Sequence, residues 1–99
     1  MLVVTRLRVS SQDNETFQNA AREALVLLSQ RAGYLAGDLG RAADDPDLWL
    51  LCSRWTGAGA YRRALSAYDS KLALAPLMAF VVDEPSAYDV VVSVPATDR

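Results

Sequence analysis

The amino-acid sequence predicts an α+β domain of the ferredoxin-like, split βαβ class, in which a four-stranded antiparallel sheet carries helices on one face. The chain has 99 residues, the size of one domain, and its 52% hydrophobic and 22% charged residues can build a packed core. Its hydrophobic periodicity changes in the order strand, helix, strand, strand, helical region, strand. We therefore expect a single domain over residues 1–99, with a core at about residues 2–94.

The first strand and the first helix are predicted from a change of period. Residues 2–9 alternate, with Val3, Thr5, Leu7 and Val9 on one face and Leu2, Val4, Arg6 and Arg8 on the other. Ser11 and Asp13 can each cap a helix. Helical spacing then relates Phe17, Ala21, Ala24, Leu25 and Leu28, and Gly33 ends the helix.

Two further strands are predicted at residues 34–43 and 47–55. The carboxylates Asp44, Asp45 and Asp47 surround Pro46 between them, which is typical of a turn, and we predict no metal site there. The second of these strands is apolar on both faces, with Leu48, Leu50 and Cys52 on one side and Trp49, Leu51 and Trp55 on the other.

A second helical region and a last strand complete the predicted fold. Thr56 can cap the helical region, Tyr61, Leu65 and Tyr68 share one face of it, and Asp69 and Ser70 mark a second start. Pro76 indicates a further helical turn or a kink. Alternation over residues 86–94 predicts the last strand. Right-handed crossovers place both helical regions on the same face of the sheet.

Composition excludes several classes of function. The net charge of -2 argues against bulk attraction to nucleic acid or to an anionic membrane. The sequence has no histidine, which excludes a His-ligated metal and a Ser-His-Asp triad, and its single cysteine permits no intrachain disulfide. No signal peptide or membrane-spanning run is recognisable, so we expect a cytoplasmic protein.

The strand at 47–55 also predicts the assembly. Helices can cover only one of its apolar faces, and a large exposed apolar sheet is unusual for a monomer. We therefore expect a homodimer in which two copies pack through their sheet faces, with an interface on the order of 2,000 Å².

Four segments, taken in their order and spacing, resemble the antibiotic biosynthesis monooxygenase (ABM) family. They are Thr5–Val9, Arg31–Tyr34, Leu48–Trp55 with Tyr61–Leu65, and Asp83–Tyr88, and the resemblance extends over about residues 2–94. It implies a dimeric α/β barrel and a cofactor-independent oxygenase that oxidises polycyclic phenols to quinones. Some relatives degrade haem through a histidine ligand, and the absence of histidine argues against that branch.

The candidate site residues lie mostly in the second half of the chain. For catalysis we consider Trp55, Tyr61, Tyr68 and Arg54, because a phenol can donate to a substrate oxygen and a guanidinium can bind a phenolate. Arg54 lies in a strand expected beside that of Arg6 and Arg8. We expect an apolar cavity between the second helical region and the sheet, lined by some of Trp55, Tyr61, Leu65, Tyr68, Leu72, Met78 and Phe80.

Two alternatives remain open. The first is that the aromatic side chains form the hydrophobic core and not a binding site, because small cores are built from large aromatic residues. The asparagines, Asn14 and Asn19, lie in or before the first helix, away from the position of the pocket asparagine in active relatives. The alternative function is therefore a non-catalytic, small-molecule-binding or stress-associated dimeric module of the same fold.

Overall fold

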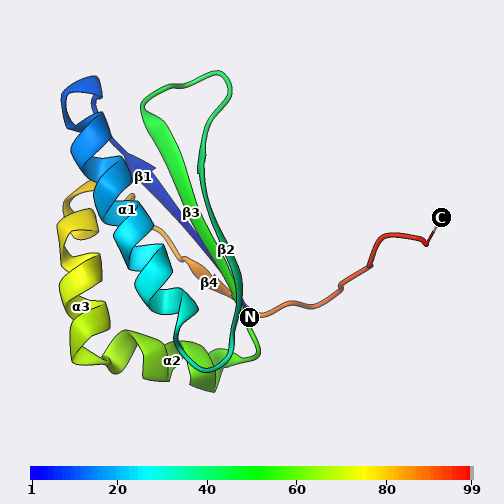
Figure 1. The fold of residues 1–99 in the computed structure, drawn as a ribbon. Helices are drawn as coiled ribbons and strands as arrows, with labels where there is room; N and C mark the ends of the chain where they lie inside the picture. The colour runs from blue at the N-terminus through cyan, green and yellow to red at the C-terminus, as the bar shows by residue number, and fades with distance from the viewer. Residues whose placement is uncertain (99) are drawn as a thin grey trace.

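The structure is a computed structural model that describes residues 1–98. In chain order, its elements are β1 (Leu2–Arg8), η1 (Ser11–Asp13), α1 (Asn14–Ser29), β2 (Tyr34–Arg41), β3 (Leu48–Trp55), α2 (Ala58–Ser66), α3 (Tyr68–Leu74), η2 (Ala75–Phe80) and β4 (Ala87–Tyr88). The four strands form one antiparallel sheet in the order β2-β3-β1-β4. Within the described residues, the helices lie on one side of this sheet (Figure 1). The predicted fold class is confirmed.

Two adjoining clusters of buried side chains fill the space between the sheet and the helices. One joins Leu7 and Val9 at the end of β1 to Phe17 on α1 and Trp49 on β3. The other lies at the opposite end of the sheet and includes Trp55, with Val3, Leu28, Ala60 and Ala64 around it. The inward faces of β1 and β3 agree with the predicted alternation, because Val3 and Leu7, and Trp49 and Trp55, are all buried.

The connections around α1 differ in detail from the expected caps. Ser11–Asp13 forms a single turn of 3₁₀ helix, and Asp13 occupies the N-cap of α1 without a side-chain capping hydrogen bond. The Asp13 carboxylate instead accepts a hydrogen bond from the Ser10 hydroxyl at 3.3 Å. At the other end, Gly33 has φ +89°, a conformation that favours glycine, and it turns the chain into β2.

The second helical region consists of three pieces. Gly57, rather than Thr56, occupies the N-cap of α2, with no side-chain capping bond. Ala67 has extended dihedral angles and separates α2 from α3, so the second helix starts at Tyr68, close to the predicted Asp69–Ser70. Pro76 then lies in the first turn of η2, as a proline at a helix start should. None of the helices among residues 1–98 is both long enough and apolar enough to cross a bilayer.

The strands are shorter than the predicted ranges, and the last differs most. The expected strand at 34–43 ends at Arg41, and the one expected at 47–55 starts at Leu48. The predicted strand at 86–94 is paired only at Ala87–Tyr88, so most of that range was wrong. The physical reason is a lack of partner backbone: Tyr88 pairs with Leu2, where β1 begins. The residues that follow extend away from the body of the molecule (Figure 1).

Candidate functional site

A cavity of about 220 Å³ lies between the inward face of the sheet and the second helical region. Its walls come from β1, β3, α2, α3, η2 and the segment before β4, and its lining residues are Thr5, Leu7, Leu51, Tyr61, Leu65, Leu74, Leu77, Met78, Val81 and Ser86. A smaller hollow of about 60 Å³ adjoins it and shares Thr5, Leu51, Tyr61, Leu65 and Leu74. The larger cavity is somewhat below the ~300–1,000 Å³ typical of small-molecule sites.

The apolar walls of this cavity and of the smaller adjoining hollow carry a few hydroxyl groups. Thr5 and Ser53 lie on the inward face of β1 and β3, where their neighbours in register are Leu51 and Val3. This register makes Thr5 and Ser53 diagonal neighbours on one sheet face. Tyr61 adds a phenol from α2. The site can therefore hold a flat apolar molecule and offer hydrogen bonds to its oxygens.

Local packing of α2 aims Tyr61 at the cavity. Ala60 and Ala64 are the buried residues of this helix, and their small side chains let it lie close to the core. Tyr61 comes directly after Ala60, and Leu65 comes directly after Ala64. These two side chains line the cavity one helical turn apart. Burial raises the pKa of the Tyr61 phenol above its usual value, so the hydroxyl keeps its proton near pH 7 and is able to donate a hydrogen bond.

Trp55 supports Tyr61 from behind instead of lining the cavity. Its ring centroid lies 5.6 Å from that of Tyr61 and 5.3 Å from that of Tyr34. The Trp55 indole N–H donates to the Ser53 hydroxyl at 2.9 Å, which fixes the plane of the ring. Trp55 is 1% exposed and belongs to the core cluster near α2. Its contact with Tyr61 makes it a positioning residue for the phenol.

The structure brings together three of the substrate-binding residues considered from the sequence, Tyr61, Leu65 and Met78. Met78 is 63% exposed and lies at the border between cavity and solvent. Tyr68 and Leu72 on α3 are 76% and 57% exposed and are not among the lining residues.

Two further candidates lie away from the cavity for different reasons. Phe80 packs edge-on against Phe17, with ring centroids 5.6 Å apart, in the other core cluster. Arg54 is exposed on β3 between the inward residues Ser53 and Trp55, so it belongs to the opposite face of the sheet. Sheet parity therefore separates Arg54 from Tyr61.

Sequence reasoning missed the strand residues of the cavity. Thr5 and Leu51 line its floor, Ser53 lines the smaller adjoining hollow, and Leu74 lines both from the end of α3. A signal for the first of these exists in the sequence, because Thr5 is the one polar residue on the apolar face of the first strand. Leu74 had no such signal, because its position depends on where α3 ends.

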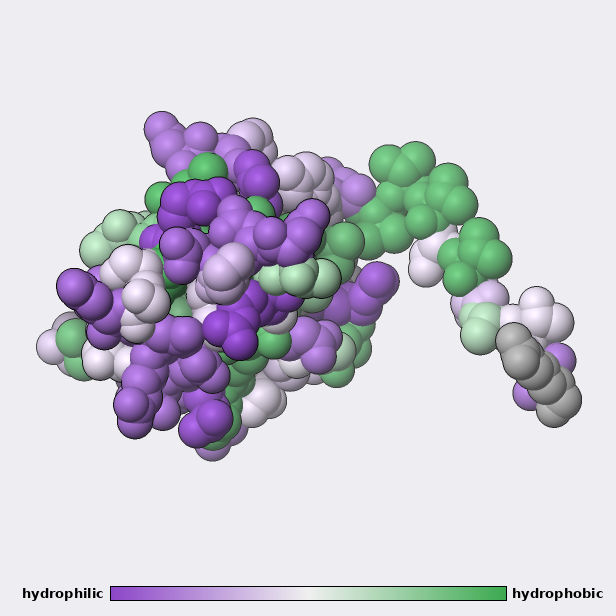
Figure 2. All heavy atoms as spheres, turned by 90° about the horizontal axis from the view of Figure 1, so that it is seen from above, coloured by the Kyte–Doolittle hydropathy of each residue, from purple (hydrophilic) through white to green (hydrophobic). Residues whose placement is uncertain are grey.

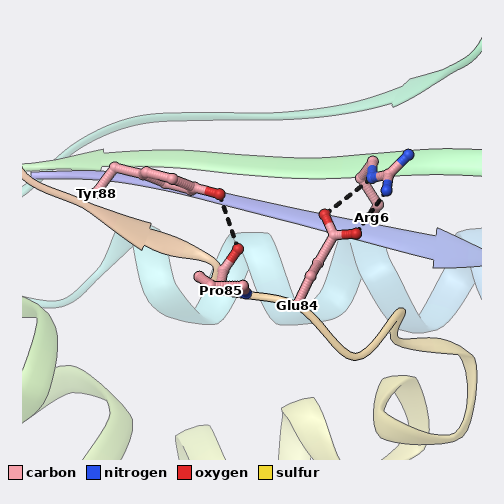
Figure 3. A network of polar contacts seen from close by, with 4 residues as sticks. All are labelled: Arg6, Glu84, Pro85 and Tyr88. Carbon is pink, nitrogen blue, oxygen red and sulfur yellow. Dashed lines mark hydrogen bonds and ion pairs between the residues drawn. The ribbon is translucent and has the colours of Figure 1, made fainter.

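The outward face of the sheet carries arginines that pair with acidic side chains of the same chain. The Arg6 guanidinium donates two hydrogen bonds to the Glu84 carboxylate, one of them 2.9 Å long (Figure 3). The Arg6 hydrogen bond holds the pKa of Glu84 below its usual value. Arg8 donates to Asp45 at 3.1 Å, and the pKa of Asp45 is lowered mainly by the backbone N–H of Asp47 and then by Arg8.

The carboxylates predicted to form a turn do so. The Asp45 side chain accepts the N–H of Asp47 at 3.1 Å, and its carbonyl accepts the N–H of Leu48 at 3.1 Å. These bonds close the β2–β3 connection and start β3.

Comparison with known proteins identifies the family. The profile of the antibiotic biosynthesis monooxygenase family matches residues 1–74. A solved structure of a variant of SnoaB, described as a cofactor-independent oxygenase from Streptomyces nogalater, is similar with a TM-score of 0.83 and 21% identity, over 96% of each chain. A candidate antibiotic biosynthesis monooxygenase from Deinococcus radiodurans gives a TM-score of 0.81 and 17% identity, over 99% of this chain and 100% of that one.

A third similar structure is a conserved protein of unknown function from Bacteroides thetaiotaomicron, with a TM-score of 0.75 and 16% identity, over 82% of this chain and 86% of that one. A search of curated protein sequences found no match. At these identities the solved structures establish the fold, while the profile match extends over most of the sequence. The chain belongs to the antibiotic biosynthesis monooxygenase family.

Proposed function

We propose that this protein is a cofactor-independent oxygenase that oxidises an aromatic, polyketide-like phenol to a quinone in the cavity beneath α2. The observation that carries the proposal is the partly enclosed apolar space with one phenol donor, Tyr61, in a chain of this family. SnoaB, whose variant shares the fold, is described as a cofactor-independent oxygenase.

The proposed reaction needs no reductant besides the substrate. A hydroxyarene reacts with one O₂, its para C–H becomes C=O, its own O–H becomes the second C=O, and one water leaves. O₂ accepts four electrons, and all of them come from the substrate. One oxygen atom of O₂ becomes the new carbonyl oxygen, and the other leaves as water. The protein has to exclude water and stabilise the phenolate oxygen as electrons leave the ring.

The residues divide these tasks. Leu51, Leu65 and Leu74 form the apolar walls that keep the ring dry. Tyr61 donates a hydrogen bond to the substrate oxygen, since its raised pKa keeps the proton on the phenol. Thr5 offers a second hydroxyl from the sheet.

A second candidate function is non-catalytic binding of a small aromatic molecule. The observation that favours it is that, within the part of the chain the structure describes, Tyr61 is the only titratable group lining the cavity. No carboxylate or amine there is available to take the substrate proton, and the sequence has no histidine. A ligand of this class would then be bound without turnover.

Oxygen uptake separates the two functions. The purified protein is given a dihydroxyanthracene-type substrate without added flavin or metal, and O₂ consumption is compared with autoxidation in buffer. Replacing Tyr61→Phe should lower the catalysed rate by roughly 10²-fold, as loss of one donor to a developing oxyanion does. Tyr68→Phe is the matched control, because Tyr68 is 76% exposed, and it should leave the rate unchanged. Binding without O₂ uptake above background would favour the second function.

We further propose that two copies associate through the outward face of the sheet. This face carries Leu2, Val4, Leu48, Leu50 and Cys52, and a shallow hollow of about 290 Å³ lies over Leu48 and Leu50. The helices leave this face uncovered (Figure 1). A second sheet would bury these apolar side chains.

Sedimentation at micromolar concentration tests this association. The wild type should run as a dimer of 10.8 kDa protomers. Leu50→Asp should abolish the dimer or leave the chain insoluble, because it places a charge at the centre of the interface. Leu72→Asp, on the exposed side of α3, is the control and should remain dimeric. A wild type that sediments as a monomer contradicts the proposal.

A further inference from the structure

The small hollow beside the cavity has the size of a site for a ligand of a few atoms. Its volume is about 60 Å³, compared with about 220 Å³ for the cavity itself. One water-sized sphere needs only about 10–15 Å³. Because Thr5, Leu51 and Tyr61 line both spaces, a small molecule in the hollow would lie next to a ring bound in the cavity.

The end of the small hollow away from the cavity is almost entirely aliphatic. Four residues line the hollow without lining the cavity: Val3, Leu25, Leu28 and Ser53. The hydroxyl oxygen of Ser53 already accepts the Trp55 indole N–H at 2.9 Å. A buried water typically makes about three hydrogen bonds, and at this end the Ser53 hydroxyl is the one side-chain group among the described residues that could offer any. Apolar cavities of this kind stay dry and take up apolar gases.

Leu25 connects the small hollow to the surface. An open groove of about 360 Å³ lies between α1 and the sheet, lined by Gln18, Arg22, Leu25, Val26, Leu39 and Trp49. Within residues 1–98, Leu25 is the one side chain that lines both this groove and the hollow, and it is partly buried. A small molecule can therefore reach the hollow past a single leucine while a larger ligand fills the cavity.

The outer surface is a poorer place for an apolar gas than the small hollow. The face of the body seen in Figure 2 is largely hydrophilic, and hydrophobic residues gather on the extended C-terminal segment instead. A two-atom molecule on an open surface keeps part of its own surface in water, whereas the hollow surrounds it with contacting atoms. We therefore expect the hollow to take up gas in preference to that surface.

We propose that the small hollow is a dioxygen site, entered past Leu25, which holds O₂ beside the aromatic ring bound in the cavity. The inference rests on the proposed oxygenase function and adds to it the place of the second substrate. Contacts can raise the affinity for a two-atom ligand by at most about a hundredfold. Occupancy therefore has to be measured by a method that suits weak binding.

Paramagnetic relaxation locates O₂ without any turnover. Methyl relaxation rates of the intact protein, with no aromatic substrate added, are measured by NMR under O₂ and under N₂, because O₂ is paramagnetic and speeds the relaxation of nuclei that it approaches. The O₂ effect on the methyl groups of Val3 and Leu28 should be several-fold larger than that on Val9. Val9 is the internal reference, since it is 1% exposed and lines neither the hollow nor the cavity. An equal effect on Val9 would overturn the inference.

Filling the small hollow should displace the gas. Leu28→Phe and Val3→Ile each add carbon to its aliphatic end, and Val3→Ile adds a single carbon, so that it is the variant a packed core accepts more readily. The O₂ effect on the unchanged residue of the pair should fall toward that on Val9. Val9→Ile is the matched control, because it adds the same carbon to the other core cluster and should leave the effect on Val3 and Leu28 unchanged. A folded Val3→Ile variant that keeps the full effect on Leu28 would contradict the proposed site.

Oxygen kinetics connect the site to the reaction and separate its failure from that of the proposed function. With a dihydroxyanthracene-type substrate, Val3→Ile should raise KM for O₂ about tenfold and leave KM for the aromatic substrate unchanged. Turnover with an unchanged KM for O₂ in this variant overturns the dioxygen site and leaves the proposed function standing. A strong O₂ effect on Val3 and Leu28 without turnover overturns the proposed function and leaves the gas site standing.

Discussion

Replacing Gly33→Ala should destabilise the fold through two effects at one position. Gly33 has φ +89°, and an L-residue held in that region costs about 1–3 kcal/mol. An added Cβ would also overlap the Cβ of Ala60 and lie 2.8 Å from the Thr56 hydroxyl oxygen. Neither atom belongs to a long side chain that could swing away, and overpacking of this kind costs about 1–3 kcal/mol.

The two costs together are about 2–6 kcal/mol, a large part of the roughly 5–15 kcal/mol by which a domain of this size is stable. For a chain of 99 residues, 1 kcal/mol lowers Tm by about 4–8 °C, so Gly33→Ala should lower Tm by at least about 8 °C. Ala60 immediately precedes Tyr61, so the displaced helix should also weaken ligand binding in the cavity.

Thermal unfolding followed by circular dichroism measures the effect, at one protein concentration because association shifts Tm. Gly57→Ala is the matched control, since an added Cβ there meets no atom within 4 Å and Gly57 has extended dihedral angles. Because Gly57 is the N-cap of α2, where alanine is less favourable than glycine, this variant should lower Tm by only a few °C. A Gly33→Ala variant as stable as Gly57→Ala would refute the reasoning.

Two further predictions concern the cavity and acid stability. Leu65→Trp should fill the cavity and abolish binding of a dihydroxyanthracene-type ligand, measured by tryptophan fluorescence quenching, while Leu72→Trp on exposed α3 should bind normally. The pKa values of Glu84 and Asp45 are lowered in the folded state, so each ionised carboxylate stabilises the fold at pH values above its unfolded pKa. This contribution is lost as the pH falls below about 4.5 for Glu84 and about 3.8 for Asp45. The urea midpoint should therefore fall with acid below pH 4.5, and less steeply in Glu84→Gln; equal slopes in both proteins would contradict the assigned Arg6 pairing.

The sheet was predictable because period-two alternation fixes which residues point inward. Trp49 and Trp55 were assigned to one face and Leu50 to the other, and their burial follows this assignment. Parity also explains why Arg54 cannot reach the cavity. Local pattern was less informative for α3, where Tyr68 and Leu72 share a helical spacing with Leu65 but face solvent. The extended backbone at Ala67 rotates α3 away from the line of α2. Asp69 and Ser70 indicated a second helix start near this point, but not the change of direction.

The last strand shows a second limit of sequence reasoning. Alternation over residues 86–94 correctly identifies strand-forming residues, but pairing also requires a backbone opposite them. That backbone depends on where β1 begins, which is a property of the register between distant segments. The two-residue β4 is therefore set by tertiary register and not by the strand-forming sequence around it.

The cavity and the proposed interface are mechanically linked, because they use alternate residues of the same strands. In β1, Thr5 lines the cavity, and its sequence neighbours Val4 and Arg6 point to the outward face. In β3, Leu51 lines the cavity, and its neighbour Leu50 points to the outward face. Packing a second sheet against the outward face would restrict the backbone that carries Thr5 and Leu51, and so reduce the entropy lost when a ligand orders the cavity floor. A dimer should therefore bind an aromatic ligand more tightly than a monomer made by dilution, and ligand should in turn lower the dimer dissociation constant by the same factor. Sedimentation with and without a dihydroxyanthracene-type ligand measures that factor, and a dissociation constant that does not respond to saturating ligand would show that the two faces are independent.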